Sequence, residues 1–312
     1  MFNEYSMGRT PNPDVLCNRE IKFDIFLQTA LSLGADFIAT GHYCIKSEEI
    51  INGKKIFRLL KGFDNKKDQS YFLCQLDQYQ LEKVIFPIGQ LRKNEVREIA
   101  KAEGLVTAEK KDSQGLCFIG KVKLPEFLQQ KLISKSGDVI QIPAKFENYD
   151  NYRFISSKSD LNKDLANPYE YKSSDGEKIG NHNGAYFYTI GQRKGLAIGG
   201  TKQPLFVIKT DINRNIIYVG EGKNHPGLYR KALRVLKSEI HWIREDKKLM
   251  DGQSVNYMTR IRYRQPLTSA KLVQNEDFLY VFFENQQLSI TPGQFIAWYH
   301  KEELIGSGTI FE

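Results

Sequence analysis

The 312-residue sequence contains no apolar run that approaches the roughly 18 residues needed to cross a lipid bilayer. Its first ten residues, Met1 to Thr10, also lack the apolar core that a secretory signal peptide requires. These two absences argue against a membrane-spanning protein and against a typical exported one. We therefore expect a soluble, cytoplasmic protein that does not use a membrane as partner.

Cysteine and histidine are scarce and scattered. The four cysteines include no Cys-x-x-Cys pair, and the five histidines lack the short spacings of zinc ligands. The sequence therefore predicts no metal site, and without an export signal it favours reduced thiols over structural disulfides. The cysteines are Cys17, Cys44, Cys74 and Cys117, and the histidines are His42, His182, His225, His241 and His300.

The composition is that of a folded protein with a basic surplus. Hydrophobic residues make up 41% and charged residues 26%, which excludes a disordered tail, a collagen-like repeat and a small disulfide scaffold. The length suggests two domains, or three small ones. The 45 basic against 37 acidic side chains leave a net charge of +8, which is compatible with a polyanionic partner such as nucleic acid.

The first part of the chain has the periodicity of an α/β domain. We expect helices over residues 19–33, 93–103 and about 124–132, and a buried strand over 35–40 that ends at Gly41-His42. Gly34 and Gly104 would end the first two helices. The residues expected to face inward are Phe23, Phe26, Leu27 and Ala30 on the first helix, and Val96, Ile99 and Ala100 on the second.

The rest of the chain is typical of β structure. Strands are expected over 136–143, 185–190, 205–210 and 216–219, with a hairpin loop at 211–215. Residues 144–178 are polar but rich in aromatics, so we interpret them as an insertion packed on the surface. Short strands over 254–264, 270–274, 278–283, 294–299 and 304–311 indicate a small closed barrel.

Two polar segments carry a cysteine each. In Gly8-Arg-Thr-Pro-Asn-Pro-Asp-Val-Leu-Cys-Asn18 two prolines make a rigid loop, and Asp14 and Cys17 stand near the start of the following helix, where a thiol pKa is lowered. Cys117 lies in the glycine-containing segment 110–120. A rigid turn or loop with a buried cysteine is the simpler interpretation of each segment taken alone, and spacing does not show whether the two sulfurs meet. Cys44 and Cys74 are assigned to packing.

Two further segments suit phosphate. The segment 189–200 combines glycines with Arg193 and Lys194, although it matches neither the P-loop nor the dinucleotide pattern. In Arg260-Ile-Arg-Tyr-Arg-Gln265 strand alternation would place Arg260, Arg262 and Arg264 on one face as a phosphate track. A loop between strands and a solvated charged face are the alternatives.

Taken together, these segments follow one order along the chain. They are residues 8–17, Ala39–His42, Lys67–Gln69, Lys111–Gly120, Ile190–Leu196 and Arg262–Gln265. In that order, and over nearly the whole chain apart from 144–178, the sequence resembles the bacterial tRNA-specific 2-thiouridylases.

The resemblance implies an architecture. Residues 1–120 would be part of an α/β nucleotide-binding domain of the adenine nucleotide α hydrolase type that carries both catalytic cysteines. Residues 121–229 would be a β-rich tRNA-binding domain that includes the insertion, and residues 230–312 a C-terminal β-barrel domain.

The resemblance also implies a tRNA-uridine 2-sulfurtransferase. Such enzymes use ATP, expected with Mg²⁺, to adenylate the O2 of the wobble uridine in tRNAs for Lys, Glu and Gln. A persulfide sulfur supplied by a sulfur-relay donor protein then displaces AMP.

By motif match, Cys117 would carry the persulfide, Cys17 would attack it as nucleophile, and Asp14 would act as acid or base. The attack would leave a Cys17–Cys117 disulfide. Gly41 would contact ATP. The tRNA would be bound by Asn12, Pro13, Asp14, His42, Lys67, Asp68, Gln69, Arg262, Tyr263 and Gln294.

The sequence departs from the family in one respect. It contains no Ser-Gly-Gly-Val-Asp-Ser loop, which grips the ATP pyrophosphate in family members. A truncated enzyme is one explanation; a non-catalytic tRNA-binding remnant or a sulfur carrier is the other. An iron–sulfur cluster on Asp14, Cys17 and Cys117 is a further alternative to the persulfide, which fits the two cysteines better.

Overall fold

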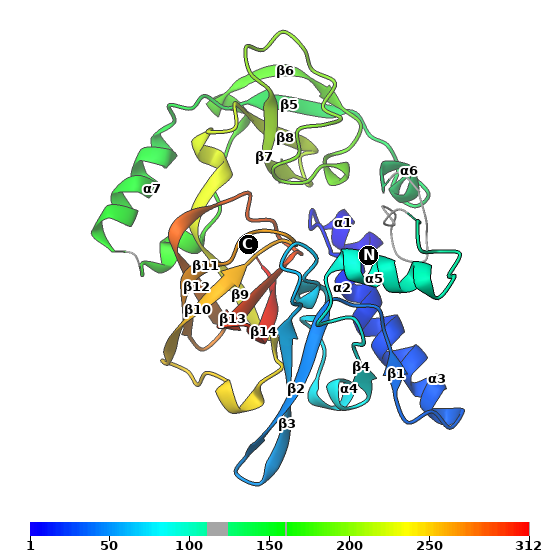
Figure 1. The fold of residues 1–312 in the computed structure, drawn as a ribbon. Coiled ribbons are helices and arrows are strands. Elements are labelled where there is room, and N and C mark those ends of the chain that lie inside the picture. Colours follow the sequence, from blue (N-terminus) through cyan, green and yellow to red (C-terminus); the bar gives the residue numbers. More distant parts are fainter. Residues whose placement is uncertain (111–123, 160, 312) are drawn as a thin grey trace.

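The computed structural model describes residues 1–110, 124–159 and 161–311. Within these residues the chain builds an N-terminal α/β part, a middle part around a four-stranded sheet, and a C-terminal barrel (Figure 1). This order confirms the predicted fold class, an α/β domain followed by two β-rich modules. No helix in the described part of the chain is long and apolar enough to span a bilayer.

The N-terminal part contains short helices around a minimal parallel sheet. In this part of the chain β1 and β4 pair in parallel over two residues each. The predicted strand 35–40 is therefore shorter than expected, and Phe37 before it is half exposed. The elements are α1 (Phe2–Ser6), α2 (Pro13–Cys17), the π-helix η1 (Asn18–Ile25), α3 (Phe26–Ser32), β1 (Ile38–Ala39), β2 (Cys44–Ile51), β3 (Lys54–Lys61), the 3-10 helix η2 (Ser70–Leu73), α4 (Gln78–Glu82), β4 (Val84–Ile85) and α5 (Lys93–Ala102).

The helix predicted over 19–33 begins earlier than expected. Asn12 caps it by accepting a hydrogen bond from the Val15 amide at 3.2 Å, Pro13 takes the first helical position, and the helical backbone runs on to Ser32. Phe26, expected to face inward, is 54% exposed. The π turn before it explains this error, because i→i+5 bonding widens the turn and rotates the residues that follow. Gly34, at φ +91°, ends the segment as predicted.

The helix predicted over 93–103 forms as α5, and Gly104 follows it at φ +65°. Its inward face is not as expected, because Ile99 is 51% exposed and no residue of α5 is buried. Amphipathic periodicity indicates which residues share a helix face, but it does not indicate whether another element covers that face.

The β2–β3 hairpin was not predicted, although its signal is in the sequence. Asn52 and Gly53 both have positive φ, as a two-residue Asn-Gly hairpin turn requires. At its other end the hairpin joins the C-terminal barrel, where Leu59 and Leu60 of β3 pair with β14.

The middle part consists of a sheet in the order β6-β5-β8-β7 and the segments around it. The predicted hairpin between β7 and β8 is confirmed. The strand predicted at 185–190 is wrong: Ala185–Phe187 forms a 3-10 turn after Gly184, at φ +137°, and the Ala185 amide donates to Asn215 Oδ1. The elements are α6 (Leu124–Leu128), β5 (Gly137–Gln141), α7 (Glu147–Lys158), the 3-10 turns η3 (Lys163–Ala166) and η4 (Ser173–Asp175), β6 (Glu177–His182), η5 (Ala185–Phe187), β7 (Leu205–Asp211), β8 (Ile216–Glu221) and η6 (Pro226–Leu228).

The segment 144–178 is packed, as its aromatics indicated, although it contains the unexpected helix α7. Tyr149, Tyr152 and Tyr171 are buried, and the Tyr149 and Tyr171 hydroxyls lie 2.9 Å apart.

The C-terminal part is a closed antiparallel barrel, as predicted. Its strands follow the order β13-β10-β11-β12-β9-β14, and β13 pairs with β14 to close the ring. The longest strand, β9, was not predicted, and the strand expected over 254–264 ends at Arg260. The elements are β9 (Tyr229–Trp242), the 3-10 turn η7 (Glu245–Lys247), β10 (Ser254–Arg260), β11 (Thr268–Gln274), β12 (Phe278–Leu288), β13 (Phe295–His300) and β14 (Glu303–Ile310).

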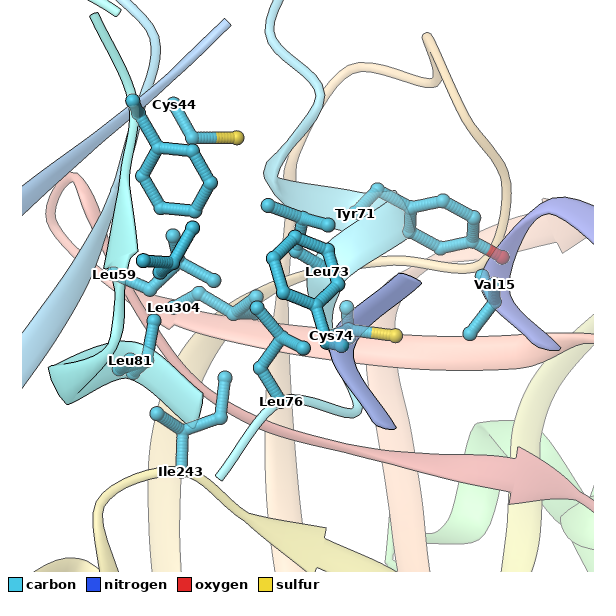
Figure 2. Packing of buried hydrophobic residues seen from close by; sticks show 14 of the residues in the cluster. Val15, Cys44, Leu59, Tyr71, Leu73, Cys74, Leu76, Leu81, Ile243 and Leu304 are labelled. Atoms are coloured by element: carbon cyan, nitrogen blue, oxygen red, sulfur yellow. The ribbon is translucent and has the colours of Figure 1, made fainter. Parts of the chain in front are cut away.

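The N-terminal part and the barrel share one hydrophobic core. Leu81 of α4 and Cys74 pack in the same cluster as Ile243 and Leu304 of the barrel (Figure 2). Cys44 and Cys74 are fully buried there, which confirms their assignment to packing. Burial raises the pKa of both thiols, that of Cys74 to about 12.

Candidate functional site

The proline-rich loop before α2 lies against the turn between β12 and β13. The Thr10 amide donates to the Pro292 carbonyl at 2.8 Å, and Gln294 Nε2 donates to the Thr10 carbonyl at 2.7 Å. Asn12 Nδ2 in turn donates to Gln294 Oε1 at 3.4 Å. Asn12 and Gln294, which are 282 positions apart and were both candidates for tRNA contact, therefore lie together.

The glycine-containing loop after residue 188 completes the same site. Thr189 Oγ1 lies 3.0 Å from Thr10 Oγ1. Arg262 Nη2 donates to the Ser289 carbonyl at 2.7 Å, to Thr291 Oγ1 at 3.0 Å and to the Ile190 carbonyl at 3.4 Å. Residues 189–192, Arg262, Thr291 and Gln294 line a pocket of about 290 Å³. The pocket thus receives side chains or backbone from the middle part and from the barrel, next to the N-terminal loop.

Thr10, Thr189 and Thr291 help to build this site but were not among the predicted residues. Thr10 lies inside the proline-rich motif, Thr189 begins the glycine-containing segment, and Thr291 precedes the Pro292-Gly293 turn. Their positions next to recognised motifs are a signal, but nothing in the sequence distinguishes a threonine that meets another segment from one that faces solvent.

The predicted track of three arginines is wrong. The strand ends at Arg260, so the alternation does not continue to Arg262 and Arg264. Arg260 is buried and donates to Asp68 Oδ2 at 2.8 Å, whereas Arg264 is exposed at φ +62° in the following loop. Arg262 is partly buried between these two, and its burial lowers the pKa of the guanidinium.

The three residues of the Lys67-Asp68-Gln69 motif lie in different surroundings. Asp68 is 4% exposed and also accepts hydrogen bonds from the Gly62 and Ser70 amides. Gln69 Oε1 accepts from the Tyr43 amide at 3.0 Å. Lys67 is partly exposed. Tyr263, from the arginine motif, packs its ring 4.2 Å from that of Phe72.

Gly41 and His42 stand at the carboxyl end of β1, the edge where open parallel sheets bind ligands. Gly41 is exposed, and a side chain there would meet only Ile88, at 4.0 Å. The backbone is therefore open to close approach, which fits a nucleotide contact. His42 is 8% exposed, contacts the Phe23 and Phe86 rings, and lies 2.9 Å from Thr40 Oγ1 through Nδ1. Burial, with a smaller contribution from Lys22, lowers its pKa to about 3.

Cys17 lies in the last turn of α2 and is 7% exposed. Pro13 and Asp14 occupy the first two positions of the same helix, so Cys17 stands within a helix rather than before one as expected. Asp14, three residues earlier, is partly exposed. Cys117 and the segment 111–120 lie outside the described residues, so the distance between the two candidate sulfurs is not defined.

Among residues 1–110, 124–159 and 161–311, no three His, Cys, Asp or Glu side chains are grouped as metal ligands would be. The set Asp14, Cys17 and Cys117, considered for an iron–sulfur cluster, includes a residue outside these ranges.

Known families match most of the chain. Residues 1–121 match the tRNA methyl transferase HUP domain, residues 168–221 the tRNA methyl transferase PRC-barrel domain, and residues 232–310 the aminomethyltransferase beta-barrel domain. The HUP assignment fits the use of an adenine nucleotide.

Similar proteins are known from several bacteria. The tRNA-specific 2-thiouridylases MnmA of Christiangramia forsetii and Flavobacterium johnsoniae are each 58% identical over 312 residues, which cover 99% of this chain and 79% of the relative. The MnmA of Bacillus subtilis is 42% identical over 310 residues, covering 99% and 73%. This chain therefore belongs to the family of tRNA-specific 2-thiouridylases, which are tRNA-modifying enzymes.

Proposed function

We propose that this protein is a tRNA-uridine 2-sulfurtransferase that thiolates the wobble uridine of tRNAs for Lys, Glu and Gln in an ATP-dependent reaction in the cytoplasm. The observation that carries the proposal is the junction at one pocket, which Arg262 and Gln294 line and where Asn12 donates a hydrogen bond to Gln294. Three candidate tRNA contacts, which come from opposite ends of the chain, share this junction, and the relatives described above carry the matching name.

In this proposal the target uridine is turned out of its stack, because an enzyme cannot reach the reacting atom of a base that is stacked between its neighbours. Asn12, Pro13 and Asp14 receive the base, and Asp14 acts as acid or base. Lys67, Gln69, Arg262, Tyr263 and Gln294 bind the tRNA around it. His42 and Asp68 are buried, so they support this interface by holding the segments that carry Gly41 and Lys67.

The thiols transfer the sulfur. Cys117 receives a persulfide from a sulfur-relay donor protein, and the Cys17 thiolate attacks the Cys117 sulfur. The S–S bond of the persulfide breaks, its outer sulfur leaves with the electron pair as hydrosulfide, and a Cys17–Cys117 disulfide forms. A dithiol reductant returns both cysteines to thiols. Gly41 would contact ATP, which with Mg²⁺ would adenylate the uridine O2. Attack of the hydrosulfide on C2 would then form the C–S bond, break the C–O bond and release AMP.

A thiolation assay tests the proposal. The protein is incubated with unmodified tRNA, ATP, Mg²⁺ and a persulfide donor, and the nucleosides are analysed by mass spectrometry for 2-thiouridine. We expect product with the unaltered chain and with Cys74→Ala, and none with Cys17→Ser. Binding of tRNA without any product would favour the non-catalytic alternative.

A second experiment tests the thiol pair alone. Mild oxidation followed by peptide mapping should give a Cys17–Cys117 crosslink, with Cys44 and Cys74 still free. A crosslink requires the two Cα atoms to approach within about 6.8 Å. Pairing through Cys44 or Cys74, or no intramolecular pair, would contradict the relay.

A further inference from the structure

A pocket of about 240 Å³ lies where the segment 144–178 meets the barrel. Helix α7 forms one wall of this pocket, and Tyr152 of α7 packs in one cluster with Ala232 of the barrel strand β9 (Figure 1). The helix lies between the segments that match the first two family models, residues 1–121 and 168–221. None of the site residues proposed above lines this pocket.

Four tyrosines form the floor and walls of the pocket. Tyr149 and Tyr152 are buried, whereas Tyr169 and Tyr229 are partly exposed. The four hydroxyl groups are engaged inside the protein, by the Tyr171 hydroxyl and by the carbonyls of Leu165, Tyr229 and Lys223 respectively. A ligand therefore has mainly the tyrosine rings to contact.

The rim of the pocket is polar. Asn224 and Gln286 are exposed there with their side-chain amides, and Arg153 is exposed in an ion pair with Asp150 at 2.8 Å. None of the described residues that line the pocket is acidic, so the lining does not favour a cationic ligand. A side-chain amide both donates and accepts hydrogen bonds, which matches the mixed donors and acceptors on the edge of a nucleobase. The lining therefore favours a planar ring with a polar edge.

The size of the pocket limits the ligand further. Sites for whole drug-sized molecules begin at about 300 Å³. A pocket of about 240 Å³ admits one planar ring system, whereas the sugar and phosphate of a nucleotide would stay outside. This favours a base that belongs to a polymer, because a free nucleotide would leave much of its surface without contacts.

The pocket also lies near the candidate tRNA site. Tyr169 lines both this pocket and a cavity of about 650 Å³. Ile190 in turn lines both that cavity and the pocket at Arg262 and Gln294. The three hollows therefore follow one another through shared walls, and an RNA bound at Arg262 has the tyrosine pocket in the same series.

We propose that Tyr169, Tyr229, Asn224 and Gln286 form a pocket that binds one unstacked base of the tRNA, outside the site that receives the target uridine. The inference rests on the proposed function, since it takes tRNA as the partner. Proteins hold unpaired bases by stacking them on aromatic rings, and every base offers a ring face for this contact. In this pocket the base stacks on the tyrosine rings, and the two rim amides hydrogen-bond its edge.

The test compares the tRNA affinity of full-chain variants over a range of salt concentrations. Tyr229→Leu removes the ring but keeps an apolar side chain, and it should weaken binding by about fivefold or more, the loss expected for one stacked base. The slope of log K against log salt should stay unchanged, because stacking neutralises no phosphate. The matched control is Tyr229→Phe, which keeps the ring and should bind like the unaltered chain.

A second variant tests the rim without touching the packed tyrosines. Asn224→Ala/Gln286→Ala changes two exposed side chains, so it should fold normally. It should weaken tRNA binding by about twofold or more through the lost hydrogen bonds, again with an unchanged salt slope. Thermal unfolding shows whether Tyr229→Leu is folded, and if it is not, the result of the rim variant decides.

The outcomes separate this inference from the proposed function. If the unaltered chain does not bind tRNA, the proposed function fails and this inference fails with it. If it binds tRNA and both variants keep its affinity, only the base pocket is overturned. Titration calorimetry with AMP and UMP identifies the source of the base: binding of a free nucleotide that Tyr229→Leu abolishes, together with unchanged tRNA affinity, would overturn the assignment to tRNA. A salt slope that falls together with the affinity would indicate a lost phosphate contact and overturn the stacking.

Discussion

Arg260 and Asp68 join two distant parts of the chain at the level of single side chains. Their ion pair is almost fully buried, and the Arg260 guanidinium also lies 4.8 Å from the centre of the Tyr299 ring. The free-energy cost of desolvating a buried ion pair is offset only when the two charges lie close together and further hydrogen bonds are formed. The two backbone amides that donate to Asp68 supply such bonds, so each partner depends on the other.

We therefore expect Asp68→Asn to destabilise the protein by about 3–5 kcal/mol, because it leaves the Arg260 charge buried without a counter-charge. Urea unfolding measures this loss. Arg264→Ala, at an exposed position, should change the free energy of unfolding by no more than about 0.5 kcal/mol. Equal effects of the two substitutions would contradict a buried Arg260–Asp68 ion pair.

His42 should make the protein sensitive to acid. Its folded pKa of about 3 lies below the ordinary value of 6.5, so the unfolded state binds the proton more readily. The His42 contribution to stability is present above pH 6.5 and is lost as the pH falls toward 3, at about 1.4 kcal/mol per pH unit.

His42→Asn keeps a polar atom near the place of Nδ1 but does not titrate. Urea unfolding at several pH values should therefore give it a shallower acid slope. Burial also lowers the pKa of His182 and His225, so a residual slope should remain. The exposed His300→Gln serves as control, and a slope that is the same in His42→Asn and in the unaltered chain would contradict this account.

At the level of elements, the loop over residues 189–195 depends on glycine at one position. Gly191 has φ +84°, and an added Cβ would lie 2.7 Å from the Ser289 Cβ. The Gly191 amide donates to the Val207 carbonyl at 2.7 Å, which fixes the loop to β7. The close approach to Ser289 is what places Ile190 beside Arg262.

Gly191→Ala should therefore destabilise the protein by about 1–3 kcal/mol, since the left-handed backbone and the clash both oppose a side chain. Displacement of the loop should also weaken tRNA binding. Gly199→Ala is the matched control, because open space surrounds Gly199 in the same glycine-rich segment. Thermal unfolding and tRNA affinity are the measurements, and similar results for both variants would be inconsistent with a role of Gly191 in shaping the pocket.

At the level of the whole molecule, the shared core predicts that the N-terminal part and the barrel unfold together. Leu81 is fully buried in α4 but packs in one cluster with Ile243 and Leu304 of the barrel. Both tryptophans, Trp242 and Trp298, belong to barrel strands, so tryptophan fluorescence reports on the barrel alone.

Leu81→Ala should cost about 2–5 kcal/mol, the usual range for a cavity in a core. The fluorescence transition of the barrel should shift with it in urea, together with the far-UV circular dichroism signal. Leu33→Ala, at a side chain that is 83% exposed, should leave both transitions in place. A shift in circular dichroism without a shift in fluorescence would indicate two independent folding units.

Local patterns predicted much of this architecture. Glycines at 34 and 104 ended helices, and the β7–β8 hairpin and most barrel strands followed from turn residues and alternation, because these signals act over a few neighbouring residues. The same reasoning could have found the Asn52-Gly53 hairpin. The motifs from residue 8 to Gln265 were sufficient to recognise the family, since each is a short contiguous segment that can be compared directly with family sequences.

Which of these residues contact one another became apparent only from the folded chain. Thr10 contacts Thr189 and Gln294, and Asn12 also contacts Gln294. Arg260 is buried in an ion pair with Asp68, whereas Ile99 is exposed. Sequence periodicity does not distinguish buried from exposed residues in these cases. Each outcome depends on contacts between segments far apart in the chain, and a hydrophobic or charged pattern does not specify its partner. Local signals were therefore enough to identify most elements and the family, whereas long-range packing determined which side chains form the site.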